Sequence, residues 1–86
     1  MQSVQSVEDL KNYLASQIVQ QLRDSGSTSV KLAKHVGLTK ARLSNIVQGR
    51  LEQFTVDKLV SVLLKMGSDV QVTIQWQAEF PWVEKK

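Results

Sequence analysis

Apolar residues recur through the first three quarters of the chain at the three- and four-residue steps of amphipathic helices. The pattern predicts a long helix from Ser6 to Gly26 and another helix from Thr55 to Gly67, each with a cap residue at its start and glycine at its end. The predicted core face of the first helix includes Leu10, Leu14, Ile18 and Leu22, and that of the last includes Val56, Leu59, Val60, Leu63 and Leu64.

The stretch between these helices predicts two shorter helices joined by a tight turn. The hydroxyl cluster at 27–29 can cap the first of them, and Gly37 ends it, because left-handed backbone is least costly without a Cβ. Only Leu38 then precedes Thr39, a second cap, and a helix over 40–48. A connection this short favours a steep crossing of the two helices, as in a helix-turn-helix unit over 28–48.

Strict alternation replaces the helical period at residues 69–77 and predicts a β-strand. Its apolar side is formed by Val70, Val72, Ile74 and Trp76. No second strand is predicted, and a lone strand leaves its backbone groups unpaired. We therefore expect the strand to pair with its copy in a homodimer.

The outward side of the helix at 40–48 is the best candidate for binding chemistry. A helical wheel places Leu43, Ile46 and Val47 on one side, and the opposite side carries amide, hydroxyl and cationic groups without a carboxylate. Such groups can contact base edges and phosphates, although a short polar helix face is often only solvated. The candidate base-facing residues are Lys40, Ala41, Ser44, Asn45 and Gln48.

The charge distribution favours a polyanionic partner for this region. Five of the eleven basic residues, and none of the eight acidic ones, lie between Ser25 and Leu51, although the net charge is only +3. Segregation of this kind on a helix pair is typical of a surface that binds double-stranded DNA. Two of these cations, Arg42 and Arg50, flank the outward side, and Lys58 is a further candidate for a phosphate contact.

The composition argues against a metal site, a membrane span and an enzyme active site. A chain of 86 residues predicts one domain, and without cysteine it has neither disulfides nor thiolate metal sites. The most apolar window, at 59–64, is too short to span a membrane, so we expect a cytoplasmic protein. The single histidine, His35, has no nearby acid or nucleophile, so we interpret it as a partly packed side chain. We expect no enzyme activity, cofactor or metal.

The run LAKHVGLTKARLSNIVQGR resembles the helix-turn-helix core of the Xre and lambdoid-repressor family, and residues 28–75 are similar to a compact subgroup that includes HigA-type antitoxins. The resemblance implies that the helix at 40–48 is the recognition helix and that Arg42 and Arg50 contact phosphates. Ser29 stands where family members often carry a phosphate-contacting glutamine. Dimerisation through a C-terminal strand, autorepression and a small ribonuclease toxin as partner are also implied.

The prediction is thus a mainly α chain, with a four-helix lambda-repressor-like domain at 6–67 and a C-terminal strand that pairs between subunits. The function predicted is a DNA-binding autorepressor and antitoxin that reads a palindromic operator. A stand-alone phage or plasmid repressor and a protein-interaction module without DNA binding are the alternatives. The tail, 78–86, carries Phe80 and Trp82, which either pack on their own dimer, the interpretation we favour, or dock on a partner such as the toxin.

Overall fold

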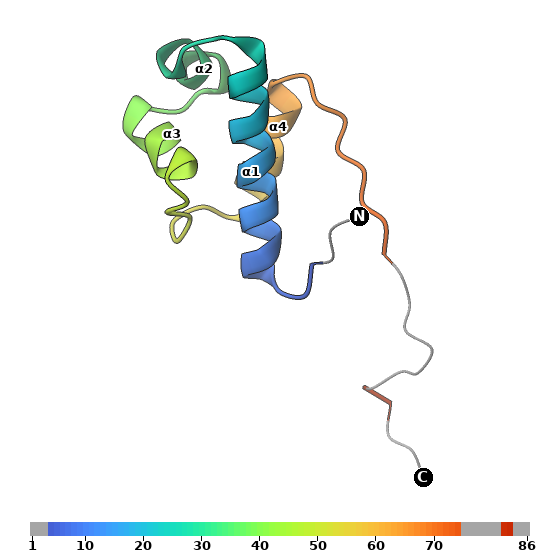
Figure 1. Cartoon of the computed structure of the whole chain (residues 1–86). Helices are drawn as coiled ribbons and strands as arrows, with labels where there is room; N and C mark the ends of the chain where they lie inside the picture. Colours follow the sequence, from blue (N-terminus) through green and yellow to red (C-terminus); the bar gives the residue numbers. More distant parts are fainter. Residues whose placement is uncertain (1–3, 75–81, 84–86) are drawn as a thin grey trace.

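The computed structural model describes residues 4–74 and 82–83, which form a helical domain followed by a segment that leaves it (Figure 1). Within these residues there are four α-helices: α1 (Val7–Ser25), α2 (Ser29–Val36), α3 (Lys40–Val47) and α4 (Val56–Lys65). In Figure 1, α1 lies in the centre with α2 and α3 on one side and α4 on the other. The predicted mainly α architecture is confirmed.

Each helix begins where a hydroxyl group accepts a hydrogen bond from the backbone N–H three residues further along. This bond satisfies one of the free N–H groups of a first turn and stabilises a helix by about 1 kcal/mol. The four caps are Ser6, Thr28, Thr39 and Thr55, which accept from the N–H groups of Asp9, Lys31, Arg42 and Lys58 at 3.0, 3.2, 3.1 and 3.1 Å. The local signals in the sequence therefore place the helix starts.

The turn between α2 and α3 is short because three consecutive residues each have one task. Gly37 adopts left-handed backbone with φ 75°, and the N–H of Leu38 donates to the carbonyl of Ala33 at 2.8 Å. The Leu38 side chain is buried, and Thr39 then caps α3. Gly37 thus ends α2, Leu38 packs in the core and Thr39 begins α3, which packs against α2.

The core lies between the four helices and is apolar throughout. Among the described residues no polar or charged side chain is buried. α1 packs against α4 and α3, and α2 packs against α3 and α4. The buried residues are Leu14, Ala15, Ile18, Leu32, Ala33, Val36, Leu38, Leu43, Ile46, Leu51, Phe54, Leu59, Val62 and Leu63.

The structure corrects the predicted core at three positions. Leu64, predicted to lie on the core face of α4, is 54% exposed, whereas Val62 takes that place and is 1% exposed. At about 100° per residue, Val62 lies about 60° from Leu59 around the helix and Leu64 about 140° from it. Val47, grouped with the apolar side of α3, is also exposed because it lies at the edge of that side.

The segment after α4 has no strand in its described part. Residues 69–74 carry no regular structure, and 75–77, with Trp76, lie outside the described residues. Val70 packs partly against the core, whereas Val72 and Ile74 are 78% and 77% exposed. A strand is defined by its hydrogen-bonded neighbour, so a single copy of the chain does not test pairing between two copies. The predicted dimerisation strand stays a prediction.

The start of this segment is nevertheless held on the helical domain. The side-chain amide of Gln21, on α1, donates to the hydroxyl of Ser68, and the N–H of Ser68 donates to the carbonyl of Leu63 at 3.1 Å. Because Ser68 is bonded to both α1 and α4, the segment leaves from the side of the domain that these two helices form. Of the tail only residues 82–83 are described, so Phe80 lies outside the described residues.

Candidate nucleic-acid interface

α3 turns one side to the core and the other to solvent. Leu43 and Ile46 are 0% and 1% exposed, and their burial fixes the rotation of the helix about its axis. The five candidate base-facing residues all lie away from Leu43 and Ile46. Lys40, Ala41 and Gln48 are exposed, and Ser44 and Asn45 are half-buried. The outward side of α3 therefore presents hydrogen-bond donors and acceptors at positions that the rotation of the helix fixes.

Three of the predicted site residues are joined by hydrogen bonds along this face. The amide nitrogen of Gln48 donates to the hydroxyl oxygen of Ser44 at 3.2 Å, and the Arg50 guanidinium donates to the amide oxygen of Gln48. The Gln48 carboxamide is thus oriented from both ends. Arg50 is fixed through its backbone as well, because its N–H donates to the Asn45 carbonyl at 2.9 Å across the left-handed Gly49.

Arg42 lies on the flank of the same helix and packs against an aromatic ring. Its guanidinium carbon is 4.5 Å from the centroid of the Phe54 ring, within the range of a cation–π contact. Arg42 is half-buried, and Phe54, from the loop between α3 and α4, is 2% exposed. No local pattern in the sequence points to the contact between Phe54 and Arg42.

The remaining candidate phosphate contacts lie at helix starts. Ser29 is the exposed first residue of α2, directly after its cap, and Lys58 is half-buried in the first turn of α4. Neither side chain forms a hydrogen bond with a residue of α3 among the described residues. The structure therefore brings Ser44, Gln48 and Arg50 together by hydrogen bonds, whereas Ser29 and Lys58 lie separately at the starts of α2 and α4.

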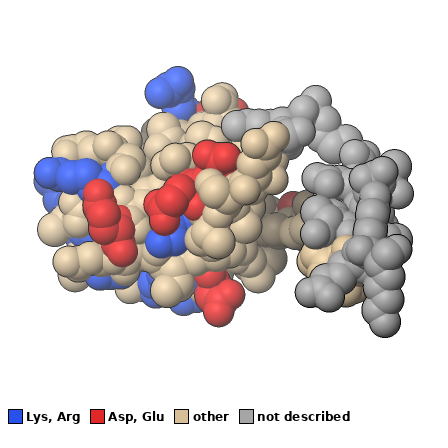
Figure 2. Space-filling model, turned by 90° about the horizontal axis from the view of Figure 1, so that it is seen from below, with Lys and Arg blue, Asp and Glu red and all other residues tan. Residues whose placement is uncertain are grey.

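Acidic side chains gather on a different part of the surface. Figure 2 looks at the end of the domain where α1 begins and shows Asp and Glu across the middle of that face, with most Lys and Arg toward its edges. Glu8 and Asp9 belong to the first turn of α1, where negative charge is favoured by the helix dipole. The candidate interface on α3 is free of carboxylates, because none occurs between Ser25 and Leu51.

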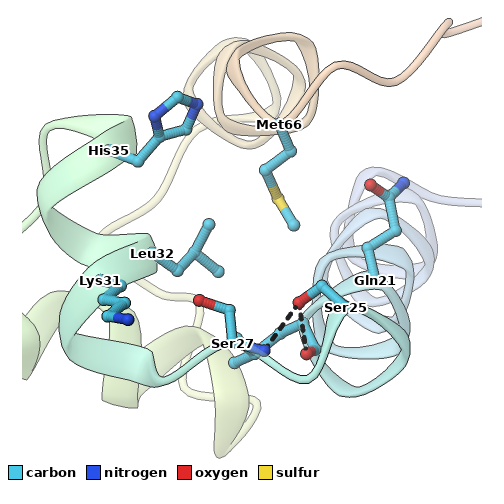
Figure 3. Close-up of a pocket in the computed structure, with 8 residues that line it drawn as sticks. Gln21, Ser25, Ser27, Lys31, Leu32, His35 and Met66 are labelled. Carbon is cyan, nitrogen blue, oxygen red and sulfur yellow. Dashed lines mark hydrogen bonds between the residues drawn. The ribbon is translucent and has the colours of Figure 1, made fainter.

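A shallow groove of about 380 Å³ lies where the end of α1, α2 and the end of α4 meet. Figure 3 shows Leu32 and Met66 pointing into it, with Lys31 and His35 from α2 at its edge. The His35 ring nitrogen Nε2 lies 2.9 Å from the carbonyl oxygen of Lys65 and donates to it, so His35 links α2 to the end of α4. His35 is exposed as a whole residue, and its side chain makes this hydrogen bond and lines the groove.

Two other kinds of site find no support among the described residues. No group of three His, Asp or Glu side chains in this part of the chain is placed to hold a metal ion. None of its helices combines the length and the apolar character needed to cross a membrane.

The four capped helices, the short turn after Gly37 and the carboxylate-free side of α3 define a helix-turn-helix domain of the DNA-binding class. The chain matches the family model described as a helix-turn-helix domain over residues 1–75, and it belongs to that family. No curated protein and no solved structure matches the chain.

Proposed function

We propose that this protein is a sequence-specific transcriptional regulator that represses its own operon. The observation that carries the proposal is the outward side of α3, where Ser44, Asn45 and Gln48 are displayed opposite the buried Leu43 and Ile46. An α-helix fits the major groove, and amide and hydroxyl groups on its exposed side can distinguish base pairs there. Regulation of this kind takes place in the cytoplasm, together with the DNA.

Cations around this helix supply the contacts that do not depend on sequence. Arg42 and Arg50 flank the base-facing residues, Lys58 adds a cation at the start of α4, and Ser29 adds a neutral hydroxyl at the start of α2. Contacts to phosphates position a domain on the duplex and provide much of the affinity at low salt. Arg50 is already held beside Gln48, so its guanidinium lies at the edge of the base-facing surface.

The proposal includes a homodimer on a palindromic operator. Val72 and Ile74 are about three quarters exposed. We expect residues 69–77 to pair with their copy in an antiparallel ribbon whose apolar side, with Val70, Val72, Ile74 and Trp76, lies on the helices. A symmetric dimer presents two copies of α3 to two half-sites about one helical turn apart. Binding both half-sites at once raises the affinity well above that of one.

The more specific proposal is an antitoxin whose partner is a small ribonuclease toxin. Its support is the likeness of residues 28–75 to the compact Xre subgroup with HigA-type antitoxins. A stand-alone phage or plasmid repressor shares the same helical domain and differs in having no toxin. Co-purification with the product of a neighbouring gene for a basic protein of toxin size would favour the antitoxin.

The test is a footprint of the purified protein on the DNA upstream of its own gene across a salt series. We expect protection of an inverted repeat that weakens steeply as salt rises, because released counterions drive binding to phosphates. An unrelated duplex of equal length is the control. If the upstream DNA is unprotected even at low salt, a protein-interaction module becomes the better interpretation of the domain.

A further inference from the structure

The contact between Arg42 and Phe54 joins the recognition helix to the loop that follows it. Arg42 belongs to the first turn of α3, where its backbone N–H is bonded to the hydroxyl of Thr39 at 3.1 Å. Phe54 comes from the other end of the α3–α4 connection, and its N–H donates to the Leu51 carbonyl at 3.0 Å. Both partners are thus held by their backbones, and the ring lies under the guanidinium at 4.5 Å.

We propose that Phe54 is a positioning residue for DNA binding, which holds the Arg42 guanidinium in place for a phosphate of the duplex. This inference rests on the proposed function, in which Arg42 contacts a phosphate of the DNA. Phe54 itself is 2% exposed and cannot touch DNA. It acts through Arg42.

The chemistry of the contact suits this task better than an ion pair would. A carboxylate beside Arg42 would neutralise its charge and occupy its N–H donors, and a phosphate would have to displace it. A ring face attracts the cation and leaves the N–H groups at the guanidinium edge available. Neither Glu52 nor Asp57, the carboxylates on either side of Phe54 in the sequence, forms an ion pair with Arg42 in the described structure.

Fixing the side chain in advance also reduces the cost of binding. A free arginine side chain loses rotamer freedom when it is immobilised on a phosphate. Arg42 is half-buried against the ring and has already lost part of that freedom in the unbound protein. The other flanking cation, Arg50, is held instead by the Gln48 amide, so the two arginines are positioned by different means.

The experiment is a double-mutant cycle with Phe54→Leu and Arg42→Ala, read out as affinity for the protected upstream DNA across a salt series. Leucine keeps the position apolar and removes the ring. We expect Phe54→Leu to weaken binding about three- to tenfold, which is the size of effect that immobilising one free arginine side chain on binding gives. The slope of affinity against salt should stay unchanged, since the charge remains. Arg42→Ala should lower that slope by about 0.9 for each phosphate that the side chain no longer binds.

The coupling between the two sites is the decisive readout. In the Arg42→Ala background, Phe54→Leu should have no further effect on DNA affinity, because the group that it positions is absent. A loss of the same size in both backgrounds would show that the ring acts by packing α3 against the core, and would overturn the proposal. Ile18→Val, a buried truncation on α1, is the control for lost stability alone.

A second variant leaves the core intact. Arg42→Lys keeps the charge but replaces the planar guanidinium by a compact ammonium group that packs less well on a ring. It should weaken binding about as much as Phe54→Leu with an unchanged salt slope, and the two losses should not add. If Arg42→Ala leaves affinity and slope at the original values, this inference fails while the proposed DNA binding stands. If the unchanged protein binds no DNA, the proposed function fails first.

Discussion

The helical domain and the segment after Ser68 contain the same kinds of apolar residue in very different surroundings. Val36 and Val62 are 0% and 1% exposed within the four helices, whereas Val72 is 78% exposed only ten residues beyond Val62. Each helix satisfies its backbone within itself and at its cap, so it needs neighbours only for its apolar side. A strand needs a neighbour for its backbone as well.

This difference shows that a periodic pattern predicts which neighbours a helix or strand needs. Whether those neighbours are present depends on the rest of the structure. The helical patterns find their partners in each other and produce a core without a buried polar side chain in the described structure. The alternating pattern at 69–74 finds no strand beside it in one copy. The proposed homodimer would supply the neighbour that this pattern requires.

The largest effect is expected from a truncation inside the helical domain. Leu59→Ala removes a side chain that is 0% exposed and should lower the free energy of unfolding by about 3 kcal/mol, through lost burial and a cavity. Urea unfolding at low protein concentration measures it. The matched change Val72→Ala should cost less than about 0.5 kcal/mol in the same assay. A similar cost at both positions would mean that Val72 is buried in the monomer.

The next effect separates the two regions directly. Val72→Pro removes a backbone N–H from the proposed ribbon and should raise the dissociation constant of the dimer by about tenfold or more. Sedimentation equilibrium measures the association, and circular dichroism should show unchanged helix content. Val72→Thr, which keeps a β-branched side chain and the N–H, is the control. A dimer that survives the proline would place the interface on the helices.

The third prediction tests whether the helical domain reads bases through Asn45. Asn45→Ala should reduce the preference for operator over scrambled DNA by about 1–3 kcal/mol for each half-site, with little change in the salt slope. Competition binding measures this preference. Asn12→Ala, at an exposed asparagine of α1, is the matched control. An unchanged preference would remove Asn45 from the base-facing residues.

The smallest effect concerns the cap that starts α3. Thr39→Ala removes the acceptor of the Arg42 N–H and should lower the free energy of unfolding by about 1 kcal/mol. Ser6→Ala removes the equivalent cap of α1 and should cost a similar amount. Only Thr39→Ala should also weaken DNA binding, because it frays the end of α3 that carries Lys40 and Ala41. Equal DNA affinity in the two variants would contradict this.

Much of the helical domain could be predicted from the sequence because its signals are local. Hydroxyl caps followed by apolar periodicity gave all four helices, and the outward side of α3 followed from the burial of Leu43 and Ile46. The exchange of Leu64 for Val62 arose from three consecutive apolar residues at 62–64, where hydrophobicity alone does not show which side of the helix is buried.

The contacts within the candidate interface were harder to predict. The Arg42–Phe54 contact joins residues twelve positions apart through a loop whose path depends on packing. The hydrogen bonds from Gln48 to Ser44 and from Arg50 to Gln48 depend on side-chain rotamers, which a helical wheel does not contain. The sequence could therefore identify the residues on the outward side of α3 but not the hydrogen bonds between them.

The length of α3 sets a limit on how much information the protein can read. Eight residues rise about 12 Å, which spans about three to four base pairs of DNA. A four-base-pair word occurs by chance about once in 256 positions, and two such words together about once in 65,000. Among the roughly 10⁶ or more competing positions of a genome, even the proposed dimer would meet many chance sites. Reliable control of one promoter then requires further discrimination, through the shape of the DNA between the half-sites or through adjacent operators.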